Sequence, residues 1–344
     1  MQRFKRHLAL AALMVAGAYS ALDASPAAAW NRGDVETFAV LPPGAPKIEG
    51  LTVADDGNVY VSTFDPTGSG HAQLFVFDKN SGRQIRNVPI SGASPATLGL
   101  GFNPKTHMLL VIDFGAGKVL SVDPNTGISQ DCITVTGNSG LNALTFDGAG
   151  NTYISDSFQG IIWKAAGCGA ATVWAKDDLL SPMQNGIPPF GANGIAFNKA
   201  GTAMFVANTS SDKLIKITVS GGTATHVAEF TNSINGADGI VIDGDDNIWV
   251  AANQADEIVV VDPSGKAIAK LGDFDGVKHG ITNGLLFPAS PAFSKDGKWL
   301  YVTNLELDLR SIGVPQSVDS QWAAQVQQHS VARLRARIPN IQGD

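Results

Sequence analysis

Short apolar strands alternate with tight polar turns along most of the chain, and the alternation repeats. Each unit opens with a side chain, usually polar, followed by a small residue and an apolar strand, and a polar turn and a second apolar strand come next. The two clearest copies are 193–197 followed by 203–206, and 238–242 followed by 248–251. The same template fits four further places, so that units begin at residues 49, 98, 142, 193, 238 and 283.

The spacing of these units indicates a β-propeller. About 40–50 residues separate successive units, and each unit offers four short strands, which is the repeat of a propeller blade. A lone strand is expected at 35–40, and the sixth unit lacks a fourth strand. The strand at 35–40 can supply it, which closes the ring and removes two free sheet edges. We therefore predict an all-β, six-bladed propeller that spans 30–344 as one domain.

Two long connections are expected on one face of the propeller. The first residue of each innermost strand would lie at one mouth of the central tunnel, on the face that also carries the connections 177–192 and 304–328. The second of these is an insertion in the last blade, with a helix expected over 318–328, and the innermost strand of that blade is expected at 283–287. Long ordered loops beside a pocket usually form its walls.

Composition and charge support this class and exclude others. The 38 glycines and 17 prolines suit many short strands joined by turns. The net charge of −7, without a basic stripe, argues against nucleic acid as a partner, because phosphate binding needs clustered Lys and Arg. The partner that remains is a small molecule.

Residues 1–29 have the organisation of a signal peptide. Basic residues near the start precede an apolar run, and three alanines at 27–29 form a small-residue cleavage site. A membrane anchor is the alternative reading, but the run is interrupted and shorter than the ~20 residues that a span requires. No later stretch could span a bilayer. We expect export, to the periplasm or outside the cell.

The chain has two cysteines, Cys132 and Cys168. Cys132 falls near an outer strand of one repeat and Cys168 in a turn of the next, so the two could be neighbours. In an oxidising compartment they could form a disulfide. Two inert thiols are the alternative.

The first position of the repeat carries the strongest chemical signal. It is occupied by an oxygen-bearing side chain in five of six units, and in order the residues are Glu49, Leu98, Asn142, Asn193, Asp238 and Asn283. Two carboxylates and two amides from four units, converging at a tunnel mouth, would form a hard oxygen site for Ca²⁺, with Mn²⁺, Mg²⁺ or Zn²⁺ as alternatives. The alternative is that these side chains only hydrogen-bond to nearby backbone at the starts of the strands.

Other catalytic systems are absent from the sequence. It contains no G-x-S-x-G elbow, H-E-x-x-H motif, phosphate-binding loop or dinucleotide fingerprint. His71 and His279 fall in loops on the tunnel-mouth face, where a role in proton transfer or substrate contact is conceivable and a solvated histidine is the plainer reading. Phe190 and Asn283 are further candidates for contacting a substrate, from their positions alone.

The segments 192–197 with 203–208, and 237–243 with 247–251, resemble the senescence marker protein (regucalcin)/gluconolactonase family, with the paraoxonases as more distant relatives. The resemblance implies that Glu49, Asn142, Asn193 and Asp238 hold a divalent metal ion. It also implies metal-dependent hydrolysis of a lactone or related ester, in which the metal polarises the carbonyl group and Asp238 activates water. A non-catalytic propeller that binds a ligand or protein, with a structural calcium, is the alternative.

Overall fold

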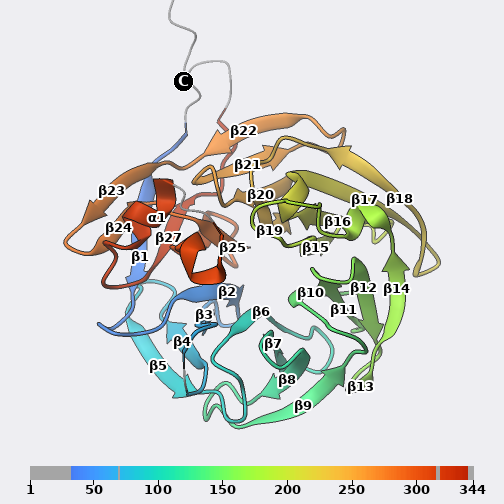
Figure 1. The fold of residues 1–344 in the computed structure, drawn as a ribbon, viewed down its shortest axis with the longest axis horizontal. Helices are drawn as coiled ribbons and strands as arrows, with labels where there is room; N and C mark the ends of the chain where they lie inside the picture. The colour runs from blue at the N-terminus through green and yellow to red at the C-terminus, as the bar shows by residue number, and fades with distance from the viewer. Residues whose placement is uncertain (1–31, 69, 315–317, 340–344) are drawn as a thin grey trace, which may run out of the picture. The chain divides into compact units, whose positions relative to one another are not determined.

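Six β-sheets are arranged as blades around a central axis (Figure 1). This computed structural model describes residues 32–68, 70–314 and 318–339, and the signal peptide expected over 1–29 lies outside them. The four main strands of every blade are antiparallel to their neighbours, and in blades 1 to 5 the chain runs outward from the innermost strand to the rim. The predicted six-bladed β-propeller is confirmed.

Five blades are continuous in sequence. Blade 1 contains β2 (Ile48–Val53), β3 (Val59–Thr63), β4 (Gln73–Phe77) and β5 (Gln84–Pro89). Blade 2 contains β6 (Thr97–Phe102), β7 (Leu109–Asp113), β8 (Lys118–Val122) and β9 (Ser129–Thr134). Blade 3 contains β10 (Leu141–Phe146), β11 (Thr152–Asp156), β12 (Ile161–Ala165) and β14 (Thr172–Lys176). Blade 4 contains β15 (Ala192–Phe197), β16 (Ala203–Asn208), β17 (Lys213–Ser220) and β18 (Thr223–Thr231), and blade 5 contains β19 (Ala237–Ile242), β20 (Ile248–Ala252), β21 (Glu257–Val261) and β22 (Ala267–Leu271).

The sixth blade is built from both ends of the propeller. Its strands are β25 (Pro288–Phe293), β26 (Trp299–Asn304), β27 (Ser330–Arg335) and, at the rim, β1 (Val35–Val40). β1 pairs with β27 in antiparallel register, from Val35 opposite Leu334 to Val40 opposite Ser330. The predicted closure of the ring by the N-terminal strand is therefore confirmed.

Apolar side chains from the second and third strands of the blades form the core. All five residues of β20 and of β21 are buried, as are all five of β3, β7 and β11. A sheet that is covered on both faces needs nearly continuous apolar runs, and these strands supply them. Large side chains such as Trp249 and Tyr153 fill the space between neighbouring blades.

Each innermost strand has a β-bulge at the point where the repeat begins. In blade 4, Ala192 pairs with Asn208 and Ile195 with Val206, so that Asn193 and its successor fall in the interruption. The other five innermost strands show the same register shift. Because a bulge re-aims the side chains of a strand, it can turn the first residue of each repeat toward the tunnel mouth.

The innermost strand of blade 6 lies later than predicted. It begins at Pro288, not at residue 283, and residues 274–284 form a separate hairpin of β23 (Phe274–Lys278) and β24 (Ile281–Gly284). Pro288 and Pro291 argue against a strand in a sheet centre, because proline cannot donate a hydrogen bond. The innermost strand is an edge of its sheet, however, and an edge tolerates proline.

The connections on the tunnel-mouth face contain short helices. Residues 177–191 include the 3₁₀ turn η1 (Asp178–Leu180), and η2 (Thr209–Ser211) follows β16. The insertion after β26 contains η3 (Leu309–Ile312) and α1 (Val318–Ala323), so the helix expected over 318–328 is shorter than predicted. Beyond its end, the backbone N–H groups of Gln327 and Gln328 donate to the carbonyl of Gly280, next to the β23–β24 hairpin, and not to the helix.

Cys132 and Cys168 form a disulfide. Beside it, the two-residue strand β13 (Gly169–Ala170) pairs in parallel with β9, so that Gly169 lies opposite Ile133. The bond and the added strand together tie the rim of blade 3 to blade 2. Within the part of the chain that the structure describes, no helix combines the length and apolar character needed to cross a membrane.

Candidate metal site at the tunnel mouth

The four oxygen-bearing residues singled out by the repeat line one cavity. Glu49, Asn142, Asn193 and Asp238 come from the bulges of four different blades, and each is 4–6% exposed. The cavity has a volume of about 40 Å³. Leu98, which has the same register in blade 2, lies in its wall. The structure thus brings together the four candidate ligands named from the sequence.

The two carboxyl groups of the cavity are held away from water and close to each other. Burial raises the pKa of Glu49 well above its ordinary value, and the charge of Asp238 raises it further. Burial likewise raises the pKa of Asp238 to about 7, although hydrogen bonds from Asn253 and Asn193 act in the opposite direction. Two buried carboxyl groups without a cation favour their protonated forms, and a divalent cation would reverse that preference.

The hydrogen bonds of the site leave oxygen atoms without partners. The Asn193 amide donates to Thr209 Oγ1 at 2.9 Å, which leaves the Asn193 oxygen available as an acceptor. Glu49 Oε2 and Asn253 Oδ1 are buried and accept no hydrogen bond. An excess of buried acceptors is costly unless a donor or a cation satisfies them. The residues therefore fit a hard divalent cation bound through carboxylate and amide oxygens.

Amide groups are essential to such a site. No group of three or more His, Cys, Asp or Glu side chains that could hold a metal ion occurs among the described residues. Glu49 and Asp238 supply two charged oxygen donors, and Asn142 and Asn193 supply neutral ones. A mixed donor set of this kind suits Ca²⁺ or Mg²⁺ better than a thiolate- or imidazole-preferring metal.

A second ring of residues, missed in the sequence, completes the site. The residue directly after the second strand lies at the same end of each blade, and in order these residues are Phe64, Phe114, Ser157, Thr209, Asn253 and Leu305. Four of the six line the cavity: Phe64, Thr209, Asn253 and Leu305. Their position after the second apolar strand is as regular as that of the first ring, so the same repeat alignment could have identified them.

Thr209 and Asn253 orient the candidate ligands. Thr209 Oγ1 accepts from Asn193 and donates to the Ala237 carbonyl at 2.7 Å, which joins blades 4 and 5 beside the site. Asn253 Nδ2 donates to Asp238 Oδ2 at 3.0 Å. Outer residues that hold a ligand in one orientation raise the affinity of a metal site.

The structure places one of the residues expected to contact a substrate at the cavity. Phe190 lines the cavity, from the connection between blades 3 and 4. Asn283 does not, because it lies on β24 and its amide donates to Asp275 Oδ2. His279 is exposed at the turn of the same hairpin, with φ +52°. The expectation for these two residues failed because the last innermost strand was placed too early.

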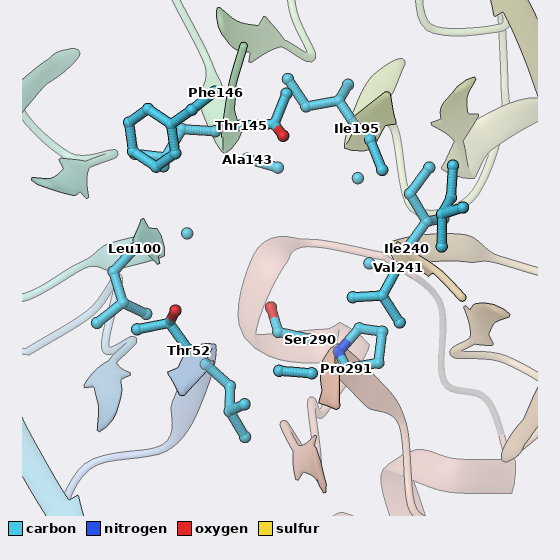
Figure 2. Close-up of a pocket in the computed structure, with 18 of the residues that line it drawn as sticks. Thr52, Leu100, Ala143, Thr145, Phe146, Ile195, Ile240, Val241, Ser290 and Pro291 are labelled. Carbon is cyan, nitrogen blue, oxygen red and sulfur yellow. The ribbon is translucent and has the colours of Figure 1, made fainter. Parts of the chain in front are cut away.

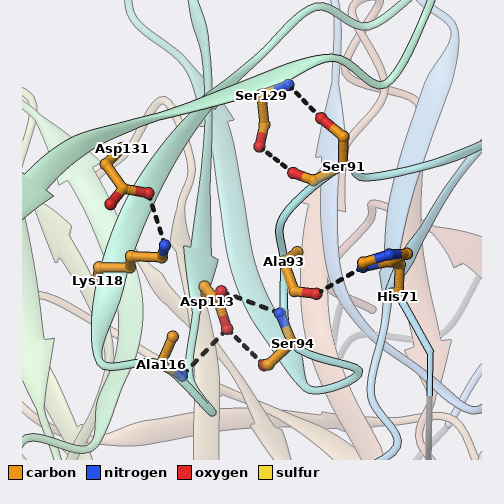
Figure 3. Close-up of polar contacts among 9 residues, drawn as sticks. All are labelled: His71, Ser91, Ala93, Ser94, Asp113, Ala116, Lys118, Ser129 and Asp131. Carbon is orange, nitrogen blue, oxygen red and sulfur yellow. Dashed lines mark hydrogen bonds and ion pairs between the residues drawn. The ribbon is translucent and has the colours of Figure 1, made fainter.

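His71 also lies outside the cavity. Its Nδ1 is 3.1 Å from the Ala93 carbonyl oxygen, and its side chain is exposed (Figure 3). The neighbouring segment is fixed by Asp113, whose carboxylate accepts from the backbone and hydroxyl of Ser94 and from the backbone of Ala116. The repeat predicts the face on which a loop lies, but not the direction of one side chain within it.

None of the described residues that line the rest of the tunnel's main cavity is ionisable. A second cavity of about 420 Å³ lies along the innermost strands, beyond the bulges. Figure 2 shows Thr52, Thr145 and Ser290 as hydroxyl-bearing residues among apolar side chains such as Leu100 and Ile240. Among the described residues, the candidate acid–base and metal-binding groups of the tunnel therefore line the smaller cavity at its mouth.

Asp256 supports one wall of the smaller cavity and leads to a prediction about pH. Phe287, a wall residue, donates its backbone N–H to Asp256 Oδ1 at 2.7 Å. Burial raises the pKa of Asp256 to about 7, with further contributions from Asp319 and Asp273. Because this folded-state pKa exceeds the unfolded value of about 4, the folded state binds more protons, and stability falls as the pH rises from about 4 to 7.

Asp256→Asn is expected to remove that loss. Asparagine keeps the acceptor for Phe287 and tolerates the left-handed backbone at φ +53°. Between pH 4 and pH 8 the stability of the variant relative to wild type should rise by about 4 kcal/mol, measured by chemical denaturation at both pH values. Parallel pH curves for the two proteins would contradict the prediction.

Comparison with known proteins gives a match to one family model over part of the chain, and a shared fold. Residues 110–272 match the family model described as SMP-30/Gluconolactonase/LRE-like region. This match contains Asn142, Asn193 and Asp238, whereas Glu49 precedes it. Comparison with curated protein sequences found no significant match.

Several solved structures share the fold at low sequence identity. A calcium-binding protein, regucalcin, from Agrobacterium tumefaciens is 19% identical, over 88% of this chain and 92% of its own, with a TM-score of 0.60. A gluconolactonase from Xanthomonas campestris is 12% identical, over 89% and 90%, with a TM-score of 0.60. A streptogramin B lyase is 14% identical, over 89% and 99%, with a TM-score of 0.59. At identities this low, the structural likeness shows the fold alone. The family-model match confirms the resemblance seen in the sequence: the chain is a six-bladed β-propeller with an SMP-30/gluconolactonase/LRE-like region.

Proposed function

We propose that the protein is a metal-dependent hydrolase of lactones or related esters, with its site at the tunnel mouth. The observation that carries the proposal is the convergence of two buried carboxyl groups and two amides on one cavity that contains unpaired acceptor oxygens. The gluconolactonase among the solved structures of the same fold supports the reaction class. Fold alone would not, because a lyase shares it.

Glu49, Asn142, Asn193 and Asp238 would hold the metal ion, with Ca²⁺ as the first candidate. The chemistry that a divalent cation supplies in such a site is polarisation of the carbonyl group and stabilisation of the charge that develops on its oxygen. Thr209 fixes the Asn193 amide, and Asn253 fixes one oxygen of Asp238. These contacts keep the donor atoms aimed into the cavity before substrate arrives.

Asp238 would act as the general base. Its Oδ2 accepts from Asn253, and its carboxylate would take a proton from water as the water oxygen attacks the carbonyl carbon. The C–O bond of the ring then breaks, and the ring oxygen takes the proton held by Asp238 to become the hydroxyl of a hydroxy acid, which returns Asp238 to its carboxylate form. The apolar walls keep other water away from the reacting atoms.

Metal binding can be tested without turnover. We expect Ca²⁺ to raise the thermal midpoint of the wild-type protein, because a ligand that binds only the folded state stabilises it. Glu49→Gln should abolish most of this rise, since it removes one of the two charges of the site. Glu229→Gln, an exposed position on β18, is the matched control and should respond as wild type does. An equal rise in all three proteins would place the metal elsewhere.

Hydrolysis itself can be separated from elimination by isotope labelling. A hydrolase incorporates one oxygen from water into the product acid, and the reaction in ¹⁸O-enriched water would show this by mass spectrometry. An unlabelled product would identify a lyase.

We also propose that the protein is exported. The disulfide between Cys132 and Cys168 supports this location, because structural disulfides persist in oxidising compartments.

A further inference from the structure

The walls above the candidate ligands are apolar. Eight side chains without a hydrogen-bonding group line the cavity together with the polar residues: Phe64, Leu98, Pro188, Phe190, Phe287, Leu305, Leu307 and Ile312. They come from blades 1, 2 and 6 and from the two long connections. The polar residues other than Glu49 belong to blades 3, 4 and 5. The cavity therefore has one polar side, which faces the site of reaction, and one apolar side.

The polar side offers few partners to a hydroxylated substrate, among them Asn253 Oδ1, which accepts no hydrogen bond. The Thr209 hydroxyl donates to Ala237 and accepts from Asn193, and the Asn253 amide donates to Asp238. The remaining polar residues are the candidate metal ligands. A sugar lactone would bury several hydroxyl groups against Phe64, Leu98 or Phe287, where they would find no partner. Its binding would be opposed at each of these contacts.

An aromatic cluster extends from the apolar side toward the surface. The rings of Phe64 and Phe114 are 6.1 Å apart, those of Phe114 and Phe158 5.7 Å, and those of Phe158 and Phe190 6.0 Å. Phe158 is 40% exposed, and Ile187 in the adjacent connection is 43% exposed. Exposed large apolar side chains that continue a buried apolar wall mark a binding surface more often than isolated ones do.

The cavity accommodates only water-sized groups beside the ligands, at about 40 Å³. A substrate must therefore displace part of the wall. Phe190 and Ile312 are the wall residues that keep partial exposure, and they belong to the two long connections. Entry between these connections would lay the substituent of a substrate along the ring of Phe190 and onto Phe158.

We propose that the substrate carries an apolar alkyl or aryl group, which packs on the cluster of Phe64, Phe114, Phe158 and Phe190, and that the site selects such lactones over polyhydroxylated ones. That the substrate is a lactone rests on the proposed function. The preference for an apolar substituent rests only on the residues that form the cavity wall.

The test compares kcat/KM of the calcium-loaded protein for γ-butyrolactone, γ-hexalactone, γ-nonalactone and glucono-δ-lactone. We expect about a fourfold increase per added methylene until the chain outgrows the cluster. Glucono-δ-lactone should be at least 100-fold poorer than γ-nonalactone. Equal or faster hydrolysis of the sugar lactone, or rates independent of chain length, would overturn the proposal.

A binding measurement separates failure of this inference from failure of the proposed function. If no lactone is hydrolysed, the hydrolase proposal fails, and calorimetry of the calcium-loaded protein with cyclopentanone, 2-heptylcyclopentanone and glucose still tests the walls. At least 50-fold tighter binding of the alkylated ketone than of cyclopentanone, with no binding of glucose, supports an apolar ligand. Equal affinities, or preferential binding of glucose, would overturn it.

Two variants test the cluster itself. Phe190→Ala and Phe158→Ala should each reduce the ratio of kcat/KM for γ-nonalactone over γ-butyrolactone by about tenfold, or reduce the affinity for 2-heptylcyclopentanone to the same extent. Val173→Ala removes an exposed apolar side chain from the rim strand β14 and should leave the ratio as in wild type. Because Phe158 is partly exposed, its variant remains informative if Phe190→Ala fails to fold. A ratio unchanged in both phenylalanine variants would show that the substituent lies elsewhere.

Discussion

Asp238→Asn is expected to lower kcat for lactone hydrolysis by about 10²–10⁴-fold, which is the usual contribution of a general base. The asparagine side chain has the same shape and keeps one oxygen for a cation, but it cannot take a proton from water. The hydrogen bond that Asn253 donates to this side chain is retained if the asparagine oxygen occupies the position of Oδ2. The variant should therefore fold, and its defect should lie in the chemical step.

The measurement must distinguish loss of the base from loss of the metal ion. Replacing Asp238 also removes one of two negative charges from the candidate site, so calcium affinity should be determined by calorimetry and kcat measured at saturating calcium. Asp245→Asn, at an exposed turn of the same blade, is the matched control and should keep wild-type activity. Full activity of Asp238→Asn with bound calcium would assign the base to another group.

The candidate ligands were predictable because a repeat converts sequence position into spatial position. The first residue of each unit falls in a bulge of an innermost strand, and symmetry brings these bulges to one tunnel mouth. Glu49 and Asp238 are 189 positions apart in the numbering, yet they share a cavity because both have that register. No property of either residue alone would have paired them.

The errors arose where the repeat is broken. The segment 283–287 matches the template in its pattern of polar, small and apolar residues. In the structure, however, its first two residues end the strand β24, and its last three are buried in the connection from β24 to β25. The innermost strand of blade 6 contains Pro288 and Pro291, and these prolines argue against a strand when the sequence alone is considered. The roles expected for Asn283 and His279 depended on that assignment. The direction of His71 depended on hydrogen bonds of its own loop, which the repeat does not encode.

The two long connections were expected to form walls, but the sequence did not show which of their residues would do so. Phe190 was identified from its position, whereas Phe287, Leu307 and Ile312 lie in connections that have no counterpart in other blades. Their positions follow from how two long connections fold over the tunnel mouth. The candidate metal ligands can therefore be predicted from the repeated part of the chain. Most of the wall residues proposed to select the substrate lie in connections that do not repeat.

Gly194→Ala is expected to cost about 4 kcal/mol or more of unfolding stability. A Cβ atom at Gly194 would lie 2.3 Å from the Asp238 carbonyl oxygen, 2.7 Å from the Ile240 nitrogen and 2.8 Å from the Gly239 Cα, all of which are backbone atoms of the next blade. Backbone cannot rotate away as a side chain can, so blades 4 and 5 would have to separate. Chemical denaturation measures the loss.

A glycine-to-alanine substitution at a position with open space around it should have almost no effect on stability. Blade 3 carries Ala143 at the register of Gly194, so the bulged strand itself accepts a Cβ atom, and the clash comes from the approach of two blades. Gly148→Ala is the matched control, since nothing lies within 4 Å of the added atom, and it should change stability by no more than about 0.5 kcal/mol. Because the clashing oxygen belongs to Asp238, Gly194→Ala should also weaken calcium binding. Wild-type stability and calcium affinity of Gly194→Ala would mean that this contact between blades does not position the site.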